Sequence, residues 1–431
     1  MATQKSHIFC GMSELDYSPS ELVQTQIEYG YNIEITPHNS IIHGNNIIFH
    51  IEGGTDWIDL ANTFLKVEIR VSQADGTAID DSVETSIANN VLHSIFSQIQ
   101  VKLKDTVISH PSSNYSYRAY LENMLNFSPA AKYTWMQTQG WHQDESSKFE
   151  TAENKGFKSR KALIAGNKIL SLKGRLCTDI SAQPLLIPSQ TDVNFTLTPQ
   201  RPEFAILRLG TADTKSYKIE ILSALLNVRK VKLYPSAVND FEKSISKNPV
   251  RLPISQIKVS TISIPRGLST YTQNSLFHGS IPNYLLIGFL DNAGYSGNYG
   301  KNPFLFQHMD LNHIQLKVND RLVPTVPFTP DFGDEKIIDS YESLFSVVGK
   351  RNQDWSNGLT VEDYVGGTAL YGFVLNEDTL CRHDSSSSGL GHVGISVKFG
   401  TSLAQTVTML IYSSAQASVI IDQYRNVLLD V

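Results

Sequence analysis

Cysteine is scarce in this chain of 431 residues, which has only Cys10, Cys177 and Cys381. Three scattered cysteines cannot form a disulfide framework, so we expect a chain that folds in a reducing compartment. The sequence has no run of about 18 apolar residues, and residues 1–30 lack the basic-then-apolar profile of a signal peptide. We therefore expect a soluble chain with no membrane span.

Positive charge is also in short supply, because the formal net charge is −6. Residues 1–30 carry Lys5 against four acidic residues, so the start of the chain is not a basic packaging tail. We expect no strong direct nucleic-acid binding. The exception is the segment from Lys155 to Arg175, which has seven basic residues and no acidic one. It could meet phosphate or an acidic partner, but a solvated loop and edge strand is the favoured interpretation.

Motifs that carry chemistry are nearly absent. Residues 389–394 match G-x-G-x-x-G, but a strand-like run at 395–399 follows where a dinucleotide site needs a helix. No H-x-x-x-H, C-x-x-C or P-loop pattern occurs. The histidines that could have formed a metal site are scattered, at His38, His43, His50, His308 and His313. We expect no catalytic, cofactor-binding or metal site, and no enzyme.

What the sequence does contain is a repeated hairpin pattern. Residues 99–108 (IQVKLKDTVI) and 314–323 (IQLKVNDRLV) share the same alternation of apolar and polar residues, and they lie about half the chain apart. Apolar residues at every second position predict half-buried strands. Lys104-Asp105 and Asn319-Asp320 predict the turns. We expect Pro111 and Pro324 to end the pairing.

An amphipathic helix is predicted after each hairpin. Apolar residues recur at helical spacing from Tyr117 to Leu125, before Pro129, and again from Ile337 to Val348, before Gly349. The shared order and spacing favour a duplication that gives two related β domains. Two helices among many short strands are typical of antiparallel sandwiches and jelly rolls.

The remaining segments complete this domain plan. We predict an N-terminal arm at 1–24, a first jelly roll at 25–238 and a second at 239–431. The polar interval 137–159 is expected to be an exposed loop, and residues 235–253 a boundary segment. Two domains of this size agree with the usual limit on a single core.

Ten short segments resemble one family. In the first half they are 13–16 (SELD), 57–63 (WIDLANT), 92–98 (LHSIFSQ), 117–122 (YRAYLE) and 228–233 (VRKVKL). In the second half they are 287–291 (IGFLD), 302–304 (NPF), 330–332 (PDF), 341–345 (YESLF) and 422–426 (DQYRN). In this order they resemble the major capsid protein of Polinton (Maverick) elements and adintoviruses.

This resemblance implies a hexon-like double jelly roll, all-β, with two eight-stranded antiparallel sandwiches side by side and a few short helices. It implies a homotrimer of pseudo-hexagonal outline that tiles an icosahedral virion, with neighbouring capsomers, penton and minor capsid proteins as partners. Assembly is expected inside the host cell, in the nucleus. The family has no catalytic residues or cofactors to carry over.

Two other functions remain open from the residues alone. One is a cellular or domesticated β-sandwich binding protein, such as a lectin-like module. The other is a hydrolase on a jelly-roll scaffold, which would need a paired-acid or metal signature that we do not find.

Overall fold

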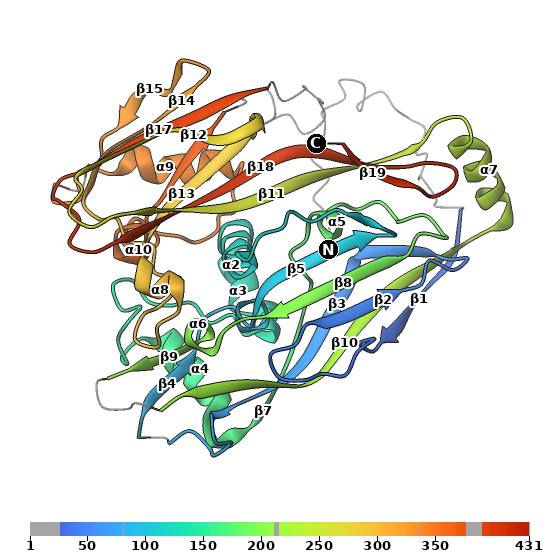
Figure 1. Ribbon diagram of the computed structural model, residues 1–431, viewed down its shortest axis with the longest axis horizontal. Coiled ribbons are helices and arrows are strands. Elements are labelled where there is room, and N and C mark those ends of the chain that lie inside the picture. Colours follow the sequence, from blue (N-terminus) through green and yellow to red (C-terminus); the bar gives the residue numbers. More distant parts are fainter. Residues whose placement is uncertain (1–25, 81, 211–214, 335, 376–389, 431) are drawn as a thin grey trace.

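The computed structural model describes residues 26–80, 82–210, 215–334, 336–375 and 390–430. Its strands form two groups that lie side by side, one from each half of the chain (Figure 1). Within these residues every sheet draws its strands from one half only.

The first half contains two four-stranded antiparallel sheets. The alternation of the sequence sets their inner faces: Leu65, Val67 and Ile69 of one strand are fully buried. In pairing order, one sheet is β1 (Ile27–Ile35), β10 (Tyr217–Leu233), β3 (Trp57–Gln73) and β7 (Ile169–Gly174). The other is β2 (Ile47–Ile51), β8 (Val193–Pro199), β5 (Phe96–Leu103) and β6 (Thr106–Val107), and β4 (Glu84–Ile87) pairs separately with β9 (Ile206–Leu209).

The second half repeats this arrangement. One sheet is β11 (Val250–Ile264), β18 (Val407–Ile421), β13 (Tyr284–Asp291) and β16 (Leu370–Val374), with β19 (Val427–Asp430) also paired to β18. The other is β12 (Thr270–Ser280), β17 (Leu390–Phe399), β14 (Leu311–Val318) and β15 (Arg321–Phe328).

The two halves share one strand order. When β4, β9 and β19 are left out, each half has eight strands, which we number one to eight in chain order. In both halves, one sheet has the strand order 1-8-3-6 and the other has the order 2-7-4-5. The repeated hairpins are strands four and five in both copies. Asn319 and Asp320 both have positive φ, at 44° and 70°, as a tight two-residue hairpin turn requires. The predicted fold, a pair of antiparallel eight-stranded sandwiches, is confirmed.

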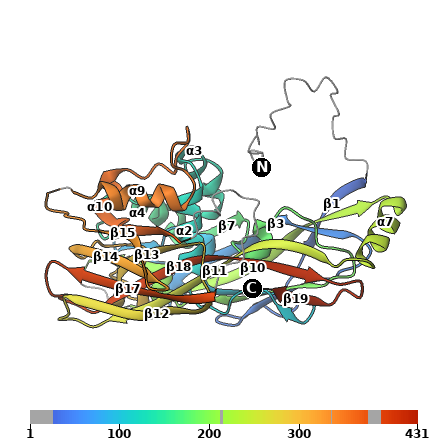
Figure 2. The same cartoon turned by 90° about the horizontal axis from the view of Figure 1, so that it is seen from above.

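The helices are short, and several of them gather beside the sheets at one end of the molecule (Figure 2). Both predicted helices are present, as α2 (Tyr115–Asn126) and α9 (Ile338–Val347). The others are α1 (Val91–Ser94), α3 (Pro129–Lys132), α4 (Lys155–Ile164), α5 (Asp179–Ala182), α6 (Pro202–Ala205), α7 (Pro235–Ile245), α8 (Asn292–Ser296) and α10 (Val361–Gly367), with 3-10 turns η1 (Trp135–Gln139) and η2 (Ala165–Asn167).

One expectation about the second hairpin is wrong. Pro324 does not end the second hairpin: it lies inside β15, which pairs on to Phe328. Residues 235–253, where we expected the boundary between the two domains, form α7 and the start of β11. Both β11 and β15 are edge strands, where proline costs no ladder hydrogen bond.

Three apolar clusters hold the fold together. One fills the first sandwich and another fills the second. The third lies between the halves, where α2 meets side chains of β11, β13, α9 and α10. The two sandwiches therefore share a core and are not joined by a linker alone.

Candidate functional site

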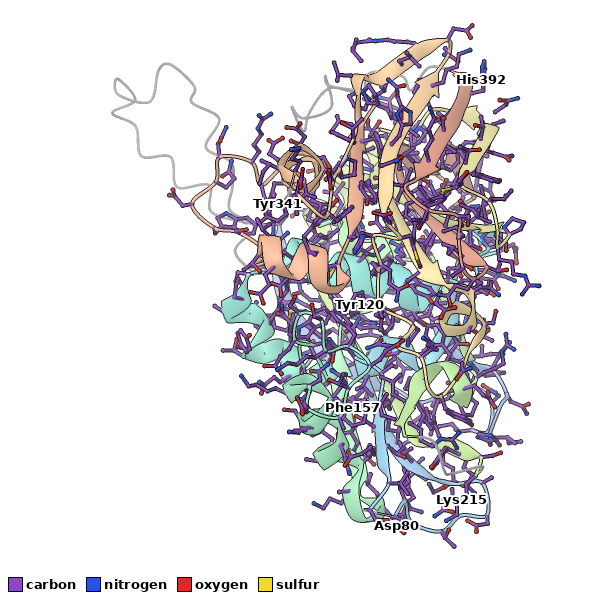
Figure 3. All side chains as sticks on the ribbon, turned by 90° about the vertical axis from the view of Figure 1, so that its left-hand side faces the viewer. Asp80, Tyr120, Phe157, Lys215, Tyr341 and His392 are labelled. Carbon is purple, nitrogen blue, oxygen red and sulfur yellow. The ribbon has the colours of Figure 1, made fainter. Side chains whose placement is uncertain are left out.

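Helix α2 is the element around which the two halves dock. Its apolar side chains recur at helical spacing, so one face stays buried along its whole length. Tyr120 lies at the centre of this face, and Figure 3 shows it at the boundary between the halves. Its ring stacks on Phe304 of the second half, with centroids 4.2 Å apart and planes 4° apart. Trp141 lies 5.4 Å from the same ring on the first-half side. The junction is an aromatic core.

A buried ion pair lies beside the start of α2. Arg118 is 2.8 Å from Asp179, whose side chain is 1% exposed, and it also contacts Glu122 one turn along the helix. Asp179 accepts a hydrogen bond from the backbone N–H of Ile257 in β11. Burial raises the pKa of Asp179 in spite of the opposing charge of Arg118. This network orients the first strand of the second half against α2.

Two buried lysines tie the halves together at the other end of α2. Lys132 of the first half donates to the carbonyl oxygens of Met124 (2.6 Å) and of Asn357 (2.7 Å) in the second half. Lys350 of the second half donates to that of Asn126 (2.8 Å) in the first half. Both lysines are nearly buried, at 2% and 6% exposure. Positive charge suits the last carbonyls of a helix, so one lysine from each half caps the C-terminal end of α2.

These lysines predict a pH-dependent stability. Burial lowers the pKa of Lys350 to about 8, and burial together with repulsion by Lys350 lowers that of Lys132 to about 7, from 10.5. Between about pH 7 and 10 the unfolded chain therefore holds more protons than the folded chain, so the free energy of unfolding rises with pH. We expect an increase of about 1–3 kcal/mol from pH 7 to pH 9 in urea titrations. Lys132→Met should remove much of this slope; a flat or falling profile in the unsubstituted chain would contradict the assignment.

The interval 137–159 was expected to be an exposed loop, and this is wrong. Trp141, Phe149 and Phe157 are buried, and α4 begins at Lys155. A backbone hydrogen bond connects the segment to the second half, because the Ser147 N–H donates to the Gly366 carbonyl oxygen at 2.8 Å. The interval belongs to the core between the halves.

A buried ion pair between this segment and the next residue, Arg160, explains how so polar a stretch is packed. Arg160 Nη2 lies 2.7 Å from Asp144 Oδ1, and both side chains are fully buried. Asp144 also accepts from Asn154 at 2.8 Å and from Asn302 of the second half at 3.5 Å. Arg160 donates to the Ile87 carbonyl at 2.8 Å. The polar groups satisfy one another.

The end of the chain returns to the first half. Arg425, only 2% exposed, donates to the Ser189 carbonyl at 2.9 Å and forms an ion pair with Glu242 of α7. Thr106 of β6 donates to the Val427 carbonyl at 2.8 Å. These contacts hold β19 against the first sandwich.

The motifs and histidines considered from the sequence do not form a chemical site in the described part of the chain. There, no group of three or more His, Cys, Asp and Glu side chains is placed to hold a metal ion. Gly391 and Gly394 lie within β17, which pairs on both sides, so no helix starts in the motif; Gly389 lies outside the described residues, as does the arm 1–24. No helix in that part is long and apolar enough to cross a membrane.

The basic run 155–175 is not one patch. Lys155 is 84% exposed, whereas Arg160 is fully buried in its ion pair. The first part of the run is helix α4 and not the expected loop. Its last part is β7, which is an edge strand as predicted.

The sequence did not predict the apolar side chains that are exposed near the junction and at sheet edges. Trp135 and Trp355 are 44% and 43% exposed, and Val326 on edge strand β15 is 76% exposed. Trp135 packs edge-on against Phe127, and Lys350 lies 4.2 Å from the Trp355 ring, so first-half and second-half aromatics flank the lysine ties. Lys350 contacts both Asn126 of the first half and the Trp355 ring, and only the fold brings these groups together, so periodicity could not predict this surface. Exposed aromatics of this kind favour protein contacts.

No family model matches the sequence. An uncharacterized protein of Caenorhabditis elegans is 24% identical over 331 residues, which cover 74% of this chain and 77% of that protein.

Solved structures match over nearly the whole chain. The cryo-EM structure of the Sputnik virophage has a TM-score of 0.65 at 14% identity, covering 97% of this chain and 91% of that one. The capsid of the virus PBCV-1 gives 0.56 at 12% identity, with 93% and 96% covered. The mavirus major capsid protein gives 0.56 at 10% identity, with 93% and 90% covered. The chain has the double jelly-roll fold, which it shares with these structures, two of which are of virus capsids or capsid proteins.

Proposed function

We propose that this chain is a structural major capsid protein that assembles with copies of itself into a virus shell. The observation that carries the proposal is the pair of sandwiches with one strand order, packed together through α2. A trimer of such a chain has six similar sandwiches around its axis, so it can fill hexagonal positions with only threefold symmetry. The fold shared with virus capsid proteins supports the same role.

Finer features are part of this proposal. We assign the two jelly rolls to residues 25–238 and 239–431, preceded by the arm. The ten matching segments favour the Polinton and adintovirus group as the source. Penton and minor capsid proteins would be partners, the virion would be the location, and assembly would take place in the host nucleus. No strong nucleic-acid binding and no catalytic, cofactor or metal site are proposed.

Oligomeric mass tests the proposal directly. We expect the purified chain to have three times the mass of one chain by light scattering, because each subunit contact should bury roughly 2,000 Å² or more, as in obligate assemblies. Negative-stain images should show pseudo-hexagonal outlines. A stable folded monomer at micromolar concentration would instead favour the β-sandwich binding protein.

A further inference from the structure

A cleft of about 470 Å³ opens at the start of α2, on the boundary between the halves. Figure 1 shows α6 and α8, which flank this boundary from the first and second half. The cleft is lined by Ser97, Ser113, Asn114, Tyr117, Pro199, Gln200, Arg201, Phe204, Tyr295 and Ser296. None of these described lining residues is acidic, and one, Arg201, carries a positive charge.

The first turn of α2 is left without a side-chain cap. Asn114 occupies the capping position, but its Nδ2 donates to the Val259 carbonyl and its Oδ1 accepts from the Tyr295 hydroxyl. The first turn of this 12-residue helix contains no acidic residue either. The backbone N–H groups at a helix start have no partner within the helix, and the helix dipole is positive there. Such an end attracts an anion.

A second, independent feature is the hydroxyl of Tyr117. This side chain lines the cleft and is only 2% exposed, and its hydroxyl has no hydrogen-bond partner in the part of the chain that is described. Burial holds its pKa well above the ordinary value, so the group stays an O–H donor. A buried donor without a partner costs free energy that a bound acceptor would recover.

The rim of the cleft supplies further donors. Arg201, Ser113 and Ser296 are exposed at its edge. A guanidinium group matches the oxygens of a phosphate with two parallel hydrogen bonds. Ser113 belongs to the first half and Ser296 to the second.

We propose that this cleft binds a phosphate-type oxyanion, held by the open start of α2, the Arg201 guanidinium and the Tyr117 hydroxyl. The anion compensates the positive end of α2 and provides the acceptor that the buried hydroxyl lacks. These three donors belong to the first half, and Ser296 of the second half lies at the same rim. An anion that also accepts from the Ser296 hydroxyl joins the two sandwiches. Binding therefore stabilises the docked chain by mass action and raises its melting temperature.

The test uses the full-length chain, with inorganic phosphate as the probe. Melting temperature is followed as phosphate is raised at constant ionic strength, with chloride and acetate in parallel, and binding is measured directly by equilibrium dialysis with labelled phosphate. The variants are Tyr117→Phe and Arg201→Gln. Arg321→Gln is the matched control, since Arg321 is an exposed arginine on β15.

We expect phosphate to raise the melting temperature of the unsubstituted chain and of Arg321→Gln equally. Each cleft variant should bind phosphate at least about tenfold more weakly. Tyr117→Phe should melt no lower than the unsubstituted chain without phosphate, since it removes only an unpartnered hydroxyl, so its lost response cannot be attributed to misfolding.

Three results would overturn the proposal: no shift with phosphate, an equal shift with chloride, or an undiminished shift in both cleft variants. An equal response to acetate would make the cleft a carboxylate site and overturn the phosphate assignment.

Discussion

Arg160→Met is expected to lower the free energy of unfolding by about 3–5 kcal/mol, because it removes one partner of a fully buried ion pair. The Asp144 carboxyl group would lose its partner, and the carbonyl oxygens of Ile87 and His142 would lose their donor. Methionine fills a similar volume, so the loss reports the unpaired groups more than a cavity. Urea denaturation at neutral pH measures it.

The control for this substitution is Lys155→Met. Lys155 belongs to the same helix and pairs with Glu145, but its side chain is 84% exposed. Surface pairs contribute little, so we expect a change below about 0.5 kcal/mol. A similarly small change in Arg160→Met would mean that the ion pair does not hold the 137–159 segment in the core.

Leu121→Ala and Leu344→Ala are each expected to cost about 2–5 kcal/mol, as buried leucines generally do. Both side chains are 1% exposed, and both belong to the cluster between the halves. The two substitutions therefore probe one shared core from the two helices that the sequence pattern predicted.

Leu185→Ala serves as the matched control, because Leu185 is 47% exposed. It should change the unfolding free energy by less than about 0.5 kcal/mol. If both core substitutions stayed in that range as well, the helices would not anchor the junction.

Alternation and turn chemistry predicted the sheets well, since a strand with one buried face must place apolar residues at every second position. Leu65, Val67 and Ile69 illustrate this, as do Asn319 and Asp320 at their turn. The duplication was visible for the same reason, because both copies obey the same periodicity.

The junction could not be predicted in this way. The 137–159 segment is buried through particular polar pairs such as Asp144 with Arg160. Such pairs join residues at irregular spacings, so they produce no periodic pattern in the sequence. The segment's isolated Trp141 and Phe149 were the available signal for burial.

The run of basic residues at 155–175 was wrongly interpreted in part as a solvated loop. A count of charges does not distinguish exposed Lys155 from buried Arg160. Pro324 in β15 was interpreted as a stop because edge positions are decided by the sheet and not by local sequence.

The reciprocal lysine ties at α2 have a consequence for synthesis on the ribosome. The helix and its aromatic face are translated early, whereas Phe304 and Lys350, which cover and cap them, come much later. At about 5–20 residues per second, the apolar face of α2 stays uncovered for roughly 10–60 s on each nascent chain. During that time the nascent chains on one polysome expose many copies of this apolar helix face at high local concentration. Production of this protein in quantity therefore depends on how well chaperones shield one helix until the second half arrives.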